Sequence, residues 1–139
     1  MKKKFRFLLA TVIIIIFCLS KTDISAQTSM PIIYKDWTVL DESKSRVEVS
    51  YRILKCNAIN QIHLSVNNKN ISDQAVIFSI QVIDNLNKLS FSKQVMQVSE
   101  HLKTNKAECG NDNIVDALKI DLPDTYEPNN LTVIAKFGE

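Results

Sequence analysis

The chain has 139 residues, of which 45% are hydrophobic and 23% charged, and its formal net charge at pH 7 is +2. This length suits one domain of ordinary size with a core of its own. The 17 basic residues do not form the stripe that nucleic-acid binding requires, so that class of protein is excluded.

The chain begins with the pattern of an export signal. Four basic residues precede an almost unbroken apolar run, residues 7–19, which is too short to span a bilayer core of roughly 30 Å. We predict a signal helix within a signal peptide over residues 1–26, cleaved after Ala26, with Ser20 as the competing cleavage site. The mature chain would carry 12 basic and 14 acidic residues. We expect it in the periplasm or outside the cell, without a membrane span.

Two cysteines remain after processing, because Cys18 leaves with the signal. An even number of cysteines in an oxidising compartment favours a disulfide between Cys56 and Cys109, and two free thiols are the alternative. Neither cysteine has a second Cys or His at the spacing of zinc ligands, so the common zinc sites are excluded.

Residues 27–35 are predicted to be a leader and residues 36–139 a single domain. From Trp37 onward apolar and polar residues alternate, which is the period of strands with one face in a core. Clusters rich in Asn and Asp, at residues 67–70 and 84–88, have the chemistry of turns. The pattern predicts strands at residues 37–40, 47–53, 62–66, 76–82, 118–122 and 131–137.

Residues 89–103 are ambiguous between strand and helix. Phe91, Val95, Val98 and Leu102 have the spacing of a helix face, whereas the short strands on either side favour another strand. Counting this strand, the pattern predicts an all-β, antiparallel β-sandwich of about seven strands.

The order of certain apolar and cysteine positions along the chain carries a family resemblance. Within it, a predicted strand that ends in Val-Asn-Asn precedes a predicted strand of the pattern apolar-x-apolar. In this order the chain resembles small exported proteins of Bacteroidota that carry a single immunoglobulin-like sandwich. The resemblance implies an immunoglobulin-like fold and an exported location, but no catalytic residue. Trp37 precedes both cysteines, so the core arrangement of antibody domains is not implied. The residues that carry the resemblance are Trp37, Val47, Val49, Tyr51, Cys56, Leu64, Val66, Asn67, Val76, Phe78, Cys109 and Leu118.

Candidate chemistry is sparse. His63 and His101 have no ligand-forming neighbours at metal spacing, and we predict both to be solvated surface side chains. The oxygen-rich segments 110–116 and 121–130 do not have the ligand spacing of an EF-hand and are predicted to be polar loops. Trp37 is predicted in the core, with Val39 as its partner on the same strand face.

The sequence therefore predicts an exported, non-enzymatic sandwich with no cofactor or metal, acting as an interaction module in the cell envelope or outside the cell. A small ligand-binding or inhibitor protein that uses loops at one end of the sandwich is the alternative. An exposed apolar patch would favour the first function, and a concave pocket with converging polar groups the second.

Overall fold

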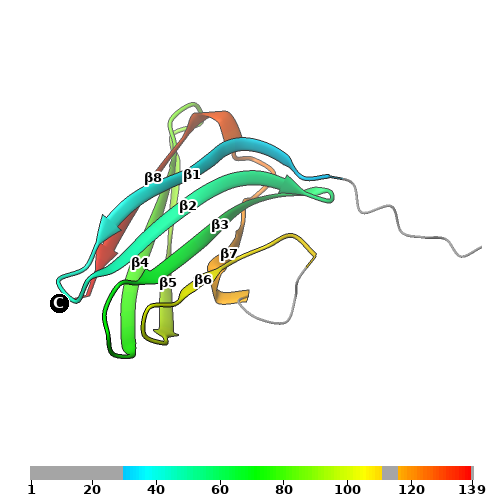
Figure 1. Cartoon of the computed structure of the whole chain (residues 1–139). Helices are drawn as coiled ribbons and strands as arrows, with labels where there is room; N and C mark the ends of the chain where they lie inside the picture. The colour runs from blue at the N-terminus through cyan, green and yellow to red at the C-terminus, as the bar shows by residue number, and fades with distance from the viewer. Residues whose placement is uncertain (1–29, 111–115, 139) are drawn as a thin grey trace, which may run out of the picture.

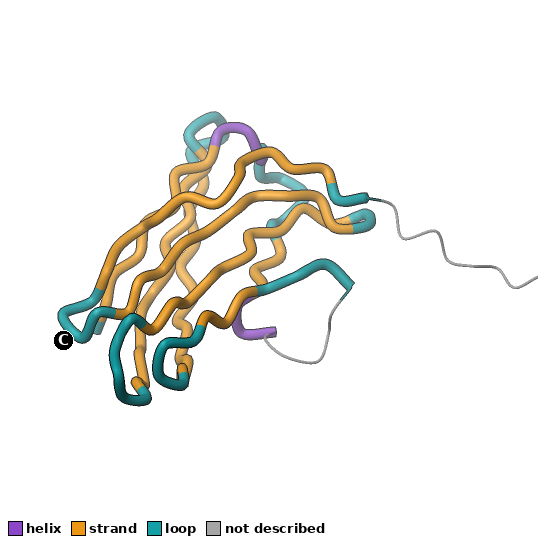
Figure 2. The backbone as a smooth tube through the Cα atoms, in the orientation of Figure 1, coloured by secondary structure: helices purple, strands orange, loops and turns teal. Residues whose placement is uncertain are grey.

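The computed structural model describes residues 30–110 and 116–138. The predicted signal peptide and residues 27–29 of the predicted leader lie outside the described residues. The described chain forms two antiparallel sheets that pack face to face, which confirms the predicted all-β sandwich (Figures 1 and 2). Its elements are β1 (Ile32–Glu42), β2 (Val47–Cys56), β3 (Ile59–Asn68), β4 (Gln74–Asp84), β5 (Leu89–Ser99), β6 (Thr104–Lys106), β7 (Lys119–Asp121) and β8 (Leu131–Phe137), with the short 3-10 helices η1 (Asp116–Leu118) and η2 (Pro128–Asn130).

The first sheet, sheet A, has the order β1-β2-β3-β6, and β7 pairs with the same edge of β3 further along. The second sheet, sheet B, has the order β5-β4-β8. β1 begins at Ile32, so the domain starts before the predicted boundary at residue 36. The three-residue β6 was not predicted, because Thr104–Lys106 has no apolar alternation and is held by its pairing with β3.

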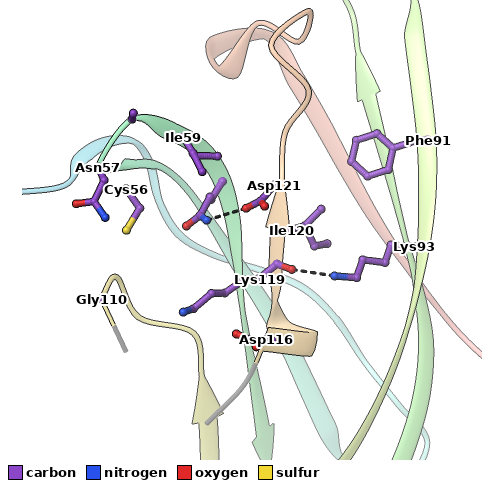
Figure 3. A pocket seen from close by; sticks show the side chains of 12 residues that line it. Cys56, Asn57, Ile59, Phe91, Lys93, Gly110, Asp116, Lys119, Ile120 and Asp121 are labelled. Atoms are coloured by element: carbon purple, nitrogen blue, oxygen red, sulfur yellow. Dashed lines mark hydrogen bonds between the residues drawn. The ribbon is translucent and has the colours of Figure 1, made fainter. Parts of the chain in front are cut away.

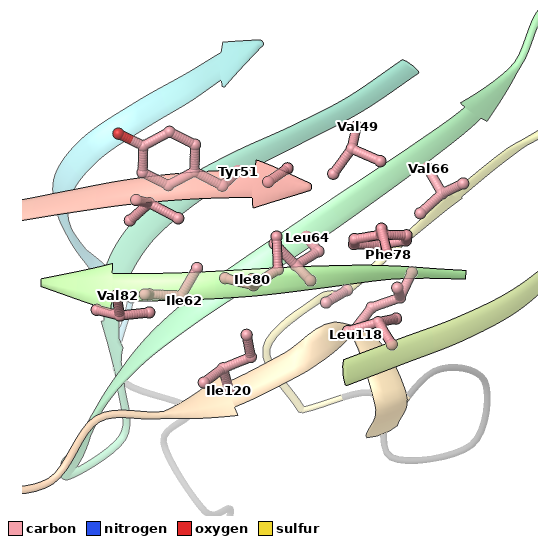
Figure 4. Close-up of a cluster of buried hydrophobic side chains, with 14 of the residues drawn as sticks. Val49, Tyr51, Ile62, Leu64, Val66, Phe78, Ile80, Val82, Leu118 and Ile120 are labelled. Atoms are coloured by element: carbon pink, nitrogen blue, oxygen red, sulfur yellow. The ribbon is translucent and has the colours of Figure 1, made fainter. Parts of the chain in front are cut away.

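The core lies between the sheets and contains the inward faces that the alternation predicts (Figure 4). Val49, Ile62 and Leu64 from sheet A face Phe78 and Ile80 from sheet B, and all five side chains are buried. Leu118, Ile120 and Leu122 close the core from η1, β7 and the residue after β7. Apolar burial from both sheets is the main stabilising contribution to such a domain.

The ambiguous residues after position 88 form a strand. β5 pairs with β4 in an unbroken antiparallel register from Gln74 opposite Ser99 to Asp84 opposite Leu89. Lys93 interrupts the apolar alternation, but its Nζ donates a hydrogen bond of 2.9 Å to the Lys119 carbonyl oxygen. This bond gives a partner to an ammonium group that points inward from the edge of the sheet.

The prediction that Trp37 and Val39 lie in the core is wrong. β1 pairs with β2 through several register shifts, and one of them falls between Lys35 and Thr38. This shift reverses the phase of the strand, since a one-residue slip exchanges its two faces. Trp37 is therefore half-buried on the outer face of sheet A, and Val39 is exposed.

The predicted disulfide is present and joins Cys56 to Cys109, with Cα atoms 5.7 Å apart. It lies within sheet A and does not cross between the two sheets. Cys56 ends β2 and Cys109 follows β6, and both strands belong to sheet A. The bridge therefore holds the segment after β6 against the end of the β2–β3 hairpin. Among the described residues, no helix is long and apolar enough to cross a membrane.

Candidate functional site

His63 is completely buried, so the prediction that it is a solvated surface residue is wrong. It lies on the outward phase of β3, between the core residues Ile62 and Leu64. An Arg52 guanidinium nitrogen lies 3.4 Å from His63 Nδ1, and His63 Nε2 lies 2.9 Å from Gln61 Oε1. Gln61 in turn donates a hydrogen bond of 2.7 Å to Asp121 Oδ1.

This polar chain fixes the protonation state of His63. Burial and, after it, the positive charge of Arg52 lower the pKa of His63 from 6.5 to about 4. The neutral ring accepts from Arg52 at Nδ1 and donates to Gln61 at Nε2. Both ring nitrogens of His63 therefore have hydrogen-bond partners, which link β2 and β3 on the outer side of sheet A. No lone pair of the ring is left to bind a metal.

A cavity of about 790 Å³ lies beside the hydrogen-bonded pair Gln61 and Asp121, at the end of the sandwich that holds the disulfide (Figure 3). The core between the sheets is packed, whereas this end of the sandwich is hollowed around β7. Its polar groups bond to one another, Lys93 to the Lys119 carbonyl and Gln61 to Asp121. The lining residues come from the β2–β3 turn, β5, β7 and the flanks of segment 111–115; they are Cys56, Asn57, Ala58, Ile59, Gln61, Phe91, Lys93, Gly110, Asp116, Lys119, Ile120 and Asp121.

At the opposite end, Asn68 ties two loops into one unit. The Asn68 side chain is completely buried, and its amide nitrogen donates to the carbonyl oxygens of Ser72, Ser99 and Glu100. Its Oδ1 accepts from the Asn70 N–H at 2.9 Å. One side chain thereby fixes both loops, because Ser72 belongs to the β3–β4 loop, Glu100 belongs to the β5–β6 loop, and Ser99 ends β5.

These two loops present large apolar side chains to solvent. Ile71 in the β3–β4 loop is 85% exposed and Leu102 in the β5–β6 loop 68%. The Leu102 N–H donates to the Asn70 carbonyl at 3.1 Å, so the loops touch. Leu102 also has a φ of 51°, a left-handed conformation that is unfavourable for a bulky side chain.

Exposed apolar side chains also lie on the outer face of sheet B, on the two strands that adjoin these loops. Ala75 pairs with Val98, and the next outward pair along the strands is Ile77 with Met96. Met96 is 69% exposed and Val98 64%. We call this set the apolar end surface; its members are Ile71, Ala75, Ile77, Met96, Val98 and Leu102.

The remaining candidate residues do not converge on a site. His101 is exposed, as predicted, and its Nδ1 lies 3.4 Å from Asp73 Oδ1. No group of three side chains suited to a metal ion occurs in residues 30–110 and 116–138. The predicted polar loop at 110–116 includes residues 111–115, which lie outside the described residues.

Sequence reasoning missed the apolar end surface and the burial of His63. Apolar residues on both phases of a strand, as at Val76, Ile77 and Phe78, are the signal that could have revealed the surface. Comparison with family models, with curated proteins and with solved structures gives no match. The functional inference therefore rests on the geometry of this chain.

Proposed function

We propose that the protein is an exported, non-enzymatic β-sandwich that acts as an interaction module in the cell envelope or outside the cell. The observation that carries this proposal is the apolar end surface. Large apolar side chains that cluster in water are unfavourable unless a partner covers them. The export signal predicted in residues 1–26 supports the location.

The way the loops are held supports a binding role. Asn68 fixes the loops that carry Ile71 and Leu102, so little conformational freedom remains to be lost on binding. The left-handed Leu102 is a second sign, because local strain is retained mainly where function requires it. The polar groups of the other end bond to one another, which favours a structural role for them over catalysis.

Envelope extracts test the proposal. The mature chain, residues 27–139, is immobilised, and the material it captures is compared with that captured by Ile71→Asp and Leu102→Asp. Leu86→Asp is the matched control, because Leu86 is 63% exposed but lies in the β4–β5 turn at the other end of sheet B. We expect both variants to lose at least ten-fold of a captured protein that the control retains. Equal capture by all four proteins contradicts the proposal.

The cavity favours a second function, that of a small ligand-binding protein. Its volume of about 790 Å³ falls in the range of ligand sites, roughly 300 to 1,000 Å³. Phe91 supplies an aromatic wall, and Lys93 supplies a cation. A thermal-shift screen with small aromatic carboxylates tests this function, with Phe91→Ala as the variant that should lose any response. No response from the wild-type protein excludes this ligand class.

A further inference from the structure

β5 is an edge strand of sheet B. Among the described residues β4 is its only strand partner, and that pairing is regular over eleven residues. The outer backbone groups of β5 therefore form a regular row, and the Val98 carbonyl oxygen accepts a hydrogen bond of 2.8 Å from the Gln97 side chain. Such a row is a template for another strand.

The other sheet edges are less suited to pairing. β1 at the edge of sheet A is broken by three register shifts, which bend and twist a strand out of line. β8 at the other edge of sheet B lies beside β1 (Figure 1). The second edge of sheet A is divided between the three-residue strands β6 and β7, so β5 is the long regular edge among the described strands.

Charge protects only the first half of β5. Lys93 points inward to the Lys119 carbonyl, and an inward charge is a common device against edge pairing. The next six residues, 94–99, carry no charge. They include Met96 and Val98, which are exposed and apolar.

We propose that a second copy of this chain pairs with residues 94–100 in antiparallel orientation and joins two copies of sheet B into one six-stranded sheet. The two-fold axis passes at Gln97, so that Gln97 faces the Gln97 of the second copy. Met96 then lies opposite Val98 of the second copy on the outer face, and Gln94 lies opposite Glu100. On the outer face apolar side chains meet apolar ones and polar side chains meet polar ones, on the inner face Val95 lies opposite Ser99, and no like charges are opposed.

This register is favoured over its neighbour. An axis at Met96 would place Val98 opposite Gln94, so that the apolar side chain of Val98 would contact a polar side chain and its contact with Met96 would be lost. A symmetric pairing also needs no other protein, because one strand supplies both halves of the interface. The inference rests on the proposed function and names the occupant of the Met96 and Val98 part of the apolar end surface. Ile71 and Leu102 stay outside the strand pair and are left for another partner.

Sedimentation velocity on the mature chain tests the dimer. We expect a dimer fraction that rises with protein concentration and is lost in Met96→Lys and in Val98→Lys. Ser90→Lys is the matched control, because Ser90 is exposed on the same strand before Lys93, and it should dimerise like the wild type. Circular dichroism establishes that each variant is folded. A wild type that stays monomeric at every concentration overturns the proposal, as does loss of the dimer in Ser90→Lys.

A single added cysteine tests the register. Directly opposed residues in an antiparallel pair have Cα atoms about 4.5 to 5.5 Å apart, which is within disulfide range. Oxidised Gln97→Cys should therefore form a covalent dimer, and Ser92→Cys should not. Crosslinking of Met96→Cys in preference to Gln97→Cys overturns the proposed axis. A monomeric protein that still captures an envelope protein through Ile71 and Leu102 refutes the dimer and leaves the proposed function standing. A protein that dimerises but captures no envelope protein supports the dimer and contradicts the proposed function.

Discussion

The side-chain amide of Asn68 lies 3.0 Å from the carbonyl oxygen of Ser99, to which it donates a hydrogen bond across 31 residues of sequence. Both residues are completely buried. Since Asn68 ends β3 in sheet A and Ser99 ends β5 in sheet B, this bond links the two sheets at the end that carries Ile71 and Leu102. The position of the apolar end surface thus depends on one polar side chain.

Asn68→Ala should destabilise the fold by about 2 to 4 kcal/mol, because it leaves buried carbonyl groups without a donor. Urea unfolding measures the change. Asn67→Ala is the control, since Asn67 is only half-buried and accepts a hydrogen bond from Thr104 at the surface. A loss of unfolding free energy for Asn68→Ala no larger than that for Asn67→Ala would show that the hydrogen bonds of the Asn68 amide do not stabilise the fold.

His63 makes stability depend on pH. The unfolded chain takes up a proton at this residue near pH 6.5 and the folded chain only near the lowered pKa of about 4. Between these values the unfolded state binds more protons, so the free energy of unfolding falls as the pH falls from 6.5 to 4, by on the order of 2 kcal/mol.

Comparison of the wild type with His63→Gln over this pH range isolates the effect. The variant should be the less stable protein at pH 7 and should lose less stability on acidification. His101→Ala should change stability by no more than about 0.5 kcal/mol, as exposed substitutions usually do. Parallel pH profiles for the wild type and His63→Gln would contradict the prediction.

Asp84 contributes in a different pH window. Burial opposes its ionisation, but hydrogen bonds from the N–H groups of Glu127 and Asn87 outweigh burial and hold the pKa of Asp84 below its usual 3.8. Stability from this group is therefore present above pH 3.8 and is lost as the pH falls through the lower folded value. Asp84→Asn should reduce the acid sensitivity that the wild type retains below pH 4, as measured by the unfolding midpoint. If the unfolding midpoint of Asp84→Asn falls with pH below pH 4 as steeply as that of the wild type, Asp84 is not the source of the acid sensitivity.

Removal of the Cys56–Cys109 bond should cost about 4 kcal/mol, the value that chain entropy gives for a loop of this length. Guanidinium unfolding of the double Cys→Ser variant measures the loss. Alkylation of unreduced mature protein provides a direct count of thiols. Two modified cysteines there would show that the bond does not form.

Phe78→Ala should cost about 3 to 5 kcal/mol, because the side chain is buried in the core against Phe137 and its removal leaves a cavity. Phe91→Ala is the control, since Phe91 is half-buried at the rim of the sandwich and contacts Tyr126. A similar loss for both variants would mean that the core does not centre on Phe78.

The inward faces of the strands could be predicted from sequence because alternation records burial directly, as in Val47, Val49 and Tyr51. The disulfide followed from cysteine number and compartment. Trp37 was misplaced because a register shift in β1 reverses the phase of the strand, and no local pattern marks that shift.

The candidate site depended on contacts that are distant in sequence. His63 lies on the phase of β3 that normally faces water, and the bonds that hold it come from β2 and from the same strand of sheet A. The apolar end surface needs the pairing of Ile77 with Met96 and the bonds of Asn68 to two loops. Periodicity cannot supply either, because it describes one segment at a time.

Trp37 is the chain's single tryptophan, and its ring stacks against the Arg52 guanidinium with 4.8 Å between the guanidinium carbon and the ring centroid. Intrinsic tryptophan fluorescence of this protein therefore has one source, on the outer face of sheet A. It is an optical readout of β1 and of the Arg52–His63 contact, and it is silent about sheet B. Events at the apolar end surface call for a label placed there.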